Sequence, residues 1–407
     1  MHEHRSNVVI VGGGLVGLLT TISLSLCKNV SSIILLDQFQ LKKKDHNRTI
    51  SISYLSVCIL KNLGVWKYIK DKVFYIREVH VSGSNLASEI IFKDRIHRIP
   101  FLGISLKEQV LLEACLKKIK EIKNLQVYEN TCIKNLIKLP NGNYKLESLV
   151  AEKEKIIFFS DIIIAADGLK SKIREYLNIQ NYSYDYNQSA IVFEIILKNH
   201  HKNFAYERFL KEGIIAMIPL EEYRMGCIWS IDNDILSKSS FFNSLDSLKE
   251  RVQNSFGYSL GKFISISTFQ IFPLSASMTK ELFFSNIIFF GNAAHSLHPV
   301  AGQGLNLSIR DIGVLFDLLK NIKDFKKLTI QDLFNHYSML RKNDHSQTFS
   351  ITHNIVKIFS GKKFFSKSLQ RILMQTLNHN EVFKYFFSEM MIGRLSKGST
   401  LMRRDSL

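Results

Sequence analysis

The chain begins with the hydrophobic pattern of a strand, a helix and a second strand. Residues 7–11 form a short run that is apolar from Val8 onward, which is typical of a parallel strand buried on both faces. Apolar residues then recur at helical spacing over 15–26, and 32–37 is a second apolar run that ends in an aspartate. The glycine-rich segment 12–17 joins the first strand to the helix. The pattern predicts a βαβ-type unit at the N-terminus.

Three glycines in this segment have GxGxxG spacing, and each has a physical role. Gly12 allows the tight turn, Gly14 lets the backbone approach a pyrophosphate, and Gly17 lets helix and strand pack closely. The helix start offers unpaired N–H groups to phosphates. Asp37 follows 20 residues after Gly17 (37 − 17), where a carboxylate would hold a ribose hydroxyl. The spacing predicts a dinucleotide site but does not choose between FAD and NAD.

Two later strands also run into turns that could bind a ligand. Residues 160–166 lead into Asp167-Gly168, and Ser171 is then suited to cap a short helix. Asp-Gly after a strand is also an ordinary turn, so both readings stay open for this stretch. Residues 286–290 lead into the glycine-rich segment 291–306, followed by helical spacing to residue 319. Its backbone N–H groups would face an electron-rich group.

The remaining segments indicate a second, sheet-rich part and a helical tail. Residues 190–197 and 224–231 are strand-like and suit a mostly antiparallel sheet. We therefore expect a discontinuous first domain (1–75, 100–180 and 281–345), a second domain (76–99 and 181–280) and a C-terminal helical region (346–407). For the tail, ordinary packing and a membrane-facing or partner-facing role both remain open.

Composition narrows the classes of function. A hydrophobic content of 46% in 407 residues is that of a globular chain with an ample core. The net charge of +18 comes from scattered lysines without interleaved arginine and aromatic residues. We therefore expect that the protein does not bind nucleic acid, and we favour attraction to an anionic membrane surface. The sequence has no uninterrupted run of 18 apolar residues, so we expect no membrane-spanning helix. We expect a cytoplasmic protein, soluble or peripheral to the inner membrane.

Cysteine and histidine spacing gives no sign of a metal. The five cysteines are widely spaced and no pair has CxxC spacing. His295 and His298 lie three residues apart, but no carboxylate or cysteine accompanies them at ligand spacing. We therefore expect no metal site, and neither histidine is assigned as a catalytic base.

The three glycine-containing stretches, in this order and at these separations, resemble the fingerprints of class A flavoprotein monooxygenases. The late stretch GNAAHSLHPVAGQGLNLSIRD is most similar to ubiquinone-biosynthesis hydroxylases. Within these, Asn292, Leu297 and His298 resemble the branch that hydroxylates 2-polyprenyl-6-methoxyphenol. The resemblance implies an α/β fold: a Rossmann-like FAD-binding domain of the para-hydroxybenzoate hydroxylase type, with an inserted, mostly antiparallel β-sheet substrate domain and a C-terminal helical region.

The resemblance also implies a reaction. FAD would be the cofactor, NADPH or NADH a transient reductant, and the flavin with O₂ would hydroxylate the ring of a prenylated phenol in ubiquinone biosynthesis. Because the cofactor carries the chemistry, no Ser-His-Asp set or pair of carboxylates is needed, and the catalytic side chains remain unknown. The partners implied are the phenol, O₂ and other proteins of ubiquinone biosynthesis. Prenyl length, the ring carbon attacked, NADH or NADPH preference and oligomeric state do not follow from the motifs.

Site residues are carried over position by position. Arg48 would lie near the phosphates or the ribityl chain, Asp167 and Gly168 near the pyrophosphate, and Gln109 and Asn292 at the ribityl hydroxyls. The ring would be lined by Pro299, Gly302, Gln303 and Gly304. The full expected cofactor set is Gly12, Gly14, Leu15, Val16, Gly17, Asp37, Arg48, Gln109, Asp167, Gly168, Gly291, Asn292, Pro299, Gly302, Gly304, Leu305 and Asn306.

Two other functions stay open on the sequence. One is a sibling flavoprotein acting on another aromatic or isoprenoid substrate. The other is a subunit that binds FAD without catalysis inside a biosynthetic complex.

Overall fold

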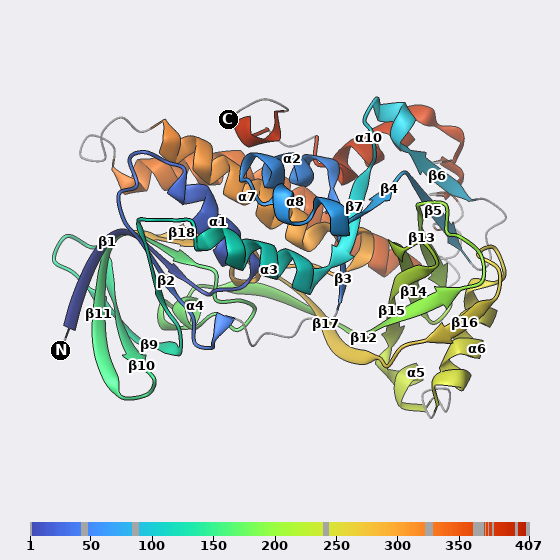
Figure 1. The fold of residues 1–407 in the computed structure, drawn as a ribbon, viewed down its shortest axis with the longest axis horizontal. Helices are drawn as coiled ribbons and strands as arrows, with labels where there is room; N and C mark the ends of the chain where they lie inside the picture. The colour runs from blue at the N-terminus through green and yellow to red at the C-terminus, as the bar shows by residue number, and fades with distance from the viewer. Residues whose placement is uncertain are drawn as a thin grey trace.

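The fold consists of two lobes, each built on a β-sheet, with long helices running between them (Figure 1). The computed structural model describes residues 2–41, 48–83, 89–238, 244–321, 329–360, 370, 372, 374–376, 378–394 and 398–403.

The first sheet is centred on β1 (His2–Val11). Its strand order is β18-β19-β11-β1-β2-β8, parallel from β19 to β8, and the hairpin β9-β10 extends it alongside β11. Val8 and Ile10 pack into one apolar cluster and Val9 and Val11 into another, so both faces are buried, as the continuous apolar run predicts. The other strands are β2 (Ile33–Leu36), β8 (Leu125–Tyr128), β9 (Thr131–Lys138), β10 (Tyr144–Val150), β11 (Glu154–Ala165), β18 (Phe283–Phe284) and β19 (Ile287–Phe289).

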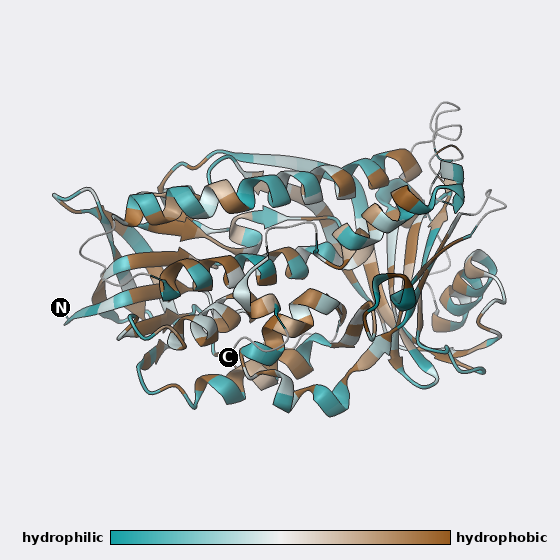
Figure 2. Ribbon diagram, turned by 90° about the horizontal axis from the view of Figure 1, so that it is seen from above, coloured by the Kyte–Doolittle hydropathy of each residue, from teal (hydrophilic) through white to brown (hydrophobic). Residues whose placement is uncertain are grey.

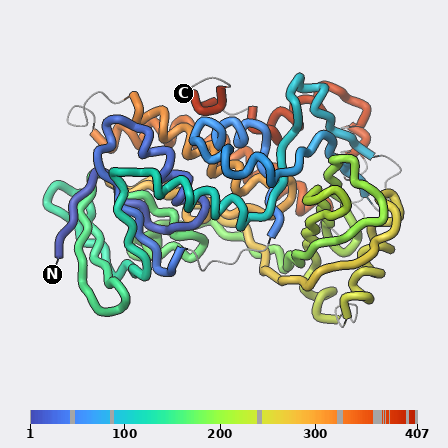
Figure 3. The backbone as a smooth tube through the Cα atoms, in the orientation of Figure 1, coloured from blue at the N-terminus to red at the C-terminus, as the bar shows by residue number. Residues whose placement is uncertain are grey.

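Helices cover this sheet and continue toward the second lobe. Helix α1 packs against α3 and α7, and α7 packs against α8. In Figure 3 the orange segment that contains α7 and α8 crosses from one lobe to the other. The helices of this layer are α1 (Leu15–Ser25), α2 (Tyr54–Asn62), α3 (Glu108–Ile119), α7 (Gln303–Lys320) and α8 (Ile330–Ser360). The short helix α4 (Lys172–Tyr176) lies on the opposite face of the sheet, where Ile173 packs with Val9 and Val11.

The second sheet is antiparallel except where β13 pairs with β5. Its order is β20-β17-β12-β15-β14-β13-β5-β6, with β16 beside β12. Trp229, Phe256 and Phe263 are fully buried in its own apolar cluster. In Figure 2 its strands are largely brown, whereas surface helices alternate brown and teal. The elements are β5 (Glu78–Gly83), β6 (Ile90–Lys93), β12 (Asn181–Leu197), β13 (Phe204–Leu210), β14 (Gly213–Glu221), β15 (Arg224–Asp232), β16 (Phe263–Ile266), β17 (Gln270–Thr279), β20 (His295–Ser296), α5 (Asn233–Lys238) and α6 (Leu245–Phe256).

A small sheet and a C-terminal helix complete the described fold. The small sheet has the order β3-β7-β4, from β3 (Thr49–Ser53), β7 (Gly103–Lys107) and β4 (Phe74–Ile76). Helix α10 (Glu381–Met391) is attached to residue 97: the side chains of Glu389 and Ser388 each lie 2.6 Å from a ring nitrogen of His97. Among the described residues, no helix has both the length and the apolar character needed to cross a membrane.

The architecture confirms the expected fold class, a mixed α/β chain with a mostly antiparallel second sheet and a helical C-terminal region. One expected boundary is wrong in detail. We placed a division between residues 345 and 346, but α8 continues through it from Ile330 to Ser360. The apolar spacing of a helix continues across residues 345 and 346, so the expected division falls inside a single helix. Strand β20, expected in the first domain, pairs with β17 of the second sheet. The domain division otherwise remains our proposal.

Candidate functional site

A cavity of about 1090 Å³ lies between the two sheets. The turns that follow β1, β11 and β19 all border it. These are the carboxyl ends of parallel strands, where open α/β sheets bind ligands. The opposite side is formed by the second sheet and by α10. The three stretches singled out in the sequence therefore meet at one place.

The glycine loop after β1 is shaped as its spacing predicts. Gly12 has φ +109°, and a Cβ there would lie 2.2 Å from the carbonyl oxygen of Ala166. A Cβ on Gly17 would lie 1.8 Å from the carbonyl oxygen of Gly12. At Gly14, by contrast, a Cβ would meet no described atom within 4 Å, and this glycine caps α1 at the cavity. The tight turn, the close packing and the open approach to a phosphate thus fall on the three glycines as expected.

Asp37 lines the cavity but is already engaged with the loop. Its Oδ2 accepts a 2.5 Å hydrogen bond from the Gly13 N–H, and its Oδ1 accepts a 2.8 Å bond from the Phe39 N–H. The carboxylate therefore holds the glycine loop in shape.

Arg48 and Glu108 form a two-pronged ion pair in the cavity wall. Nε of Arg48 contacts Oε2 of Glu108, and Nη2 lies 3.0 Å from Oε1. Gln109, expected at the ribityl chain, does not line the cavity; its amide donates to Glu113 on the outer side of α3. At this point of the cavity wall the structure has Glu108 in place of the expected Gln109.

Asp167 offers a buried oxygen that lacks a partner within the described chain. Its Oδ2 accepts from the Ile173 N–H at 3.3 Å, while Oδ1 is buried without a hydrogen bond. Burial raises the pKa of this carboxyl. Ser171 caps α4 as predicted, accepting from the Arg174 N–H. An unpaired buried acceptor at the cavity wall fits a hydroxyl-bearing cofactor.

The loop between β19 and α7 is tied to strand β3. Asn306 accepts from the Ser53 N–H and donates to the Ser51 carbonyl. Gly302 has φ +59°, and a Cβ on it would lie 2.3 Å from the Ser51 hydroxyl oxygen. At Gly304 a Cβ would meet no described atom within 4 Å, which leaves this turn open toward the cavity. Asn306 therefore fixes the loop rather than facing the cavity with a free amide.

The other expected residues of this loop lie at the cavity. Asn292 is exposed into it, and Pro299 and Leu305 line it. The amide of Gln303 donates to the carbonyl of Met391 at the end of α10, so this side chain links the loop to the C-terminal helix. Leu15, Val16, Gly168 and Gly291, expected around the cofactor, also line the cavity.

His298 is a buried, neutral member of the loop. Its Nε2 lies 3.2 Å from Oε1 of Gln188, and its Nδ1 accepts from the Val300 N–H at 3.2 Å. Burial lowers the pKa of His298 to about 3. The side chain therefore fixes the loop against β12.

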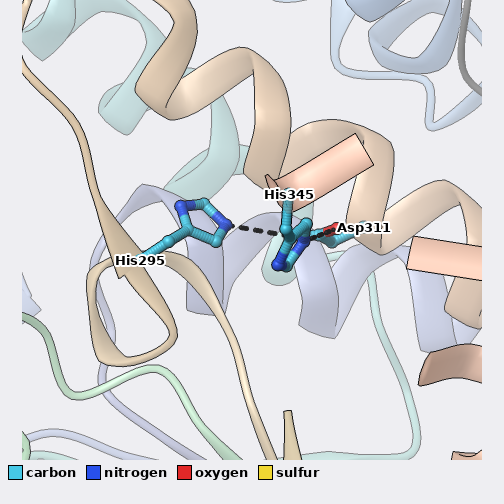
Figure 4. A group of neighbouring side chains, drawn as sticks. All are labelled: His295, Asp311 and His345. Carbon is cyan, nitrogen blue, oxygen red and sulfur yellow. Dashed lines mark hydrogen bonds and ion pairs between the residues drawn. The ribbon is translucent and has the colours of Figure 1, made fainter. Parts of the chain in front are cut away.

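His295 belongs to a buried cluster whose members lie too far apart in the sequence to be recognised from spacing. Figure 4 shows His295 and His345 directed at Asp311, with Nε2–oxygen distances of 3.1 and 2.7 Å. The three side chains have the composition of a metal site. However, Nε of Arg341 lies 2.6 Å from the same Asp311 oxygen as His345, and a guanidinium there opposes a second cation. We assign the cluster to anchoring β20 on α7 and α8.

Glu207 is a cavity residue that sequence reasoning missed as a site. It lies on β13, lines the cavity and accepts a 3.3 Å hydrogen bond from the Ala301 N–H. Ala301 has φ +60°, an uncommon conformation for a residue with a side chain. The signal in the sequence was a carboxylate between Ala205 and Phe209, the two apolar residues that share its face of the strand at a period of two.

The chain matches known proteins over most of its length. The family model described as FAD binding domain matches residues 5–341. The chain is 23% identical to the ubiquinone biosynthesis monooxygenase COQ6 of Dictyostelium discoideum, covering 98% of this chain and 92% of the relative. It is 23% identical to the 3-demethoxyubiquinol 3-hydroxylase of Escherichia coli, covering 85% of this chain and 88% of the relative.

A solved structure shows the same fold. The p-nitrophenol 4-monooxygenase PnpA of Pseudomonas putida superimposes with a TM-score of 0.78 at 15% identity, covering 97% of this chain and 100% of the other. The expected resemblance to FAD-dependent ring hydroxylases and the expected FAD cofactor are thereby confirmed. With the family model matched over residues 5–341 and its three fingerprint stretches meeting at one cavity, the chain belongs to the FAD binding domain family.

Proposed function

We propose that this protein is an FAD-dependent monooxygenase that hydroxylates the aromatic ring of a prenylated phenol in ubiquinone biosynthesis. The carrying observation is the composition of the cavity. One end has the glycine loop, the Arg48–Glu108 pair and Asp167, which suit phosphates and hydroxyls. The other end is an apolar sheet face that includes Val79, Ile218 and Phe92.

The division of labour follows from these two ends. FAD, reduced by NADPH or NADH, supplies the oxygen-transfer chemistry with O₂. The chain holds the pyrophosphate at Gly14 and the ring against the segment from Pro299 to Gly304. It also keeps the apolar part of a substrate in a space that excludes water, which limits wasteful loss of the activated oxygen. Only one Gly-rich dinucleotide motif is present, which suits a reductant that binds transiently.

The assignment to ubiquinone biosynthesis is supported by the printed names of two relatives, COQ6 and 3-demethoxyubiquinol 3-hydroxylase. Both relatives are 23% identical to this chain, so their names do not indicate which ring carbon is hydroxylated. The branch that acts on 2-polyprenyl-6-methoxyphenol is proposed on Asn292, Leu297 and His298 alone.

The test uses the purified protein. We expect bound FAD, oxidation of NADPH or NADH that depends on a prenylated phenol, and a product one oxygen heavier by mass spectrometry. A colourless protein after incubation with FAD would contradict the proposal. Bound FAD that neither nucleotide reduces in the presence of the phenol would favour a non-catalytic subunit. Turnover of a different aromatic, with none of the prenylated phenol, would favour the sibling enzyme.

We also propose peripheral contact with an anionic membrane through one side of α10. Val382, Phe383 and Phe386 are 66%, 59% and 55% exposed. The other side of the helix borders the cavity through Phe387 and Met391. A lipid-like substrate could therefore pass from the bilayer edge toward the cavity, and the net charge of +18 favours an anionic surface.

A further inference from the structure

The face of the second sheet that borders the cavity carries one carboxylate in a row of hydrocarbon side chains. Glu207 on β13 has Val81 of β5 and Ala216 of β14 as its cross-strand neighbours. The row continues from Ala216 to Ile228 and Val192. All five side chains line the cavity. Packing alone favours a hydrocarbon at position 207, because an unpaired carboxylate is costly in such a wall.

Glu207 has little to compensate for this position. In the described part of the chain, its one hydrogen bond comes from the Ala301 N–H at 3.3 Å, and no ion pair reaches it. The titratable side chain on the same loop, His298, is bonded to Gln188 and Val300 instead. The carboxylate therefore keeps acceptor capacity that faces the cavity.

The position of Glu207 connects the two ends of the cavity. Ala301 lies within the segment from Pro299 to Gly304, where we place the flavin ring. The aliphatic row around Glu207 is where we place the apolar part of a substrate. A phenol ring held between them would bring its hydroxyl group close to this carboxylate.

We propose that Glu207 accepts a hydrogen bond from the phenolic hydroxyl of the substrate and takes its proton during hydroxylation. This inference rests on the proposed function. The phenolic O–H bond breaks and a carboxylic acid O–H bond forms on Glu207, without transfer of electrons between the two groups. The phenolate oxygen makes the ring more nucleophilic, and the proton returns to the same oxygen of the product.

The acid–base properties of the surroundings agree with this role. Burial raises the pKa of Glu207 to about 7, although the Ala301 N–H acts in the opposite direction. A carboxyl group that titrates near neutral pH is well matched to accepting and returning a proton. The strands beside it present Val81 and Ala216, and α8 and α10 present Ile355, Phe359, Phe387 and Met391 to the cavity. On the loop, His298 is neutral because burial lowers its pKa to about 3.

The experiment measures binding to the FAD-loaded protein without reductant. The probes are 2-geranylphenol and its methyl ether, which lacks the hydroxyl proton, and binding is followed by perturbation of the flavin absorbance. The variants are Glu207→Gln, which keeps the shape, and Glu207→Leu, which matches the aliphatic row. The control is Glu250→Gln, the same chemical change at an exposed residue of α6. Equal FAD content of all four proteins shows that they are folded.

In the wild type and in Glu250→Gln, we expect the phenol to bind at least about tenfold more tightly than the ether, as for a hydrogen bond to a charged group. The preference should grow as pH rises through about 7. It should lose its pH dependence in Glu207→Gln and disappear in Glu207→Leu. An unchanged preference and pH profile in both variants would overturn the role of Glu207 alone. A wild type that holds FAD but binds neither probe would overturn the proposed substrate as well.

Discussion

Nε2 of His295 lies 3.1 Å from Oδ2 of Asp311, and this contact joins strand β20 to helix α7. The other oxygen of Asp311 receives Arg341 and His345 from α8. Burial alone would raise the pKa of Asp311, but His345 and Arg341 hold it well below its usual range. The carboxylate therefore fixes the start of the loop that runs from β20 to α7.

Replacing Asp311 should destabilise the protein strongly. In Asp311→Asn, Arg341 loses a buried carboxylate partner, and we expect the free energy of unfolding to fall by about 3–5 kcal/mol. Urea unfolding measures the change, and Asp71→Asn, at an exposed position, is the control. A loss below about 0.5 kcal/mol would mean that the cluster anchors nothing.

The neutral state of His298 predicts a loss of stability on acidification. The unfolded chain takes up a proton at this side chain below its ordinary pKa of 6.5, whereas the folded chain does so only near pH 3. The free energy of unfolding should therefore fall between these values, by up to about 1.4 kcal/mol per pH unit from this group. Urea titrations from about pH 7 to pH 5 should show a shallower slope in His298→Gln. Equal slopes would show that His298 is not kept neutral in the fold.

Gly14→Glu should abolish FAD retention while the chain still folds. A Cβ at this position would meet no described atom within 4 Å, so we expect the chain to fold, but the added carboxylate would face the pyrophosphate. Flavin absorbance after gel filtration measures retention, and circular dichroism measures folding. Gly14→Ala is the control for added bulk without charge. Full FAD occupancy in Gly14→Glu would show that the loop does not bind the pyrophosphate.

Asn292→Asp should keep phenol-dependent activity within about tenfold, which corresponds to about 1.4 kcal/mol. The residue is exposed into the cavity, and both side chains accept hydrogen bonds from hydroxyl groups. Oxidation of NADPH or NADH in the presence of the phenol gives the rate. Total loss of activity with normal FAD content would assign the amide N–H a specific role.

The double variant Phe383→Ser/Phe386→Ser should weaken binding to vesicles that contain phosphatidylglycerol. Each exposed ring would contribute about 1.5 kcal/mol or more when it enters the interface, so we expect a loss of at least about tenfold. Co-sedimentation with the vesicles measures binding. Tyr258→Ser, at a 69% exposed ring in the turn after α6, is the control. An equal loss in both proteins, or none, would remove α10 from the membrane contact.

Local patterns in the sequence were sufficient to predict much of the framework. The apolar run within 7–11 lies in the central strand β1. A strand with apolar side chains on both faces is stable only where other elements cover both faces of the sheet. The three glycines at 12, 14 and 17 meet different surroundings, as their spacing predicts. Each of these features depends on residues within a few positions of one another.

The pair Glu108 and Gln109 shows where such local patterns stop being sufficient. Gln109 and Glu108 are adjacent in the sequence, but successive helical residues point about 100° apart. At the start of α3, Glu108 therefore meets Arg48 at the cavity, while Gln109 meets Glu113 on the outer side. Only the orientation of the helix on the sheet decides which of the two faces inward.

The sequence by itself determined the strand–turn–helix units, a dinucleotide site and the order of the three loops, because short-range spacing dictates these features. The choice of FAD came from the family resemblance of the three stretches. Only the tertiary structure decided which distant side chains share a site. Asp311 meets His345 across 34 residues and His295 across 16, and Glu207 meets Ala301 across 94. A strand pattern of period two shows that two faces differ, but not which one borders a cavity. That choice depends on how the sheets and helices pack, since packing determines which polar groups lose water together.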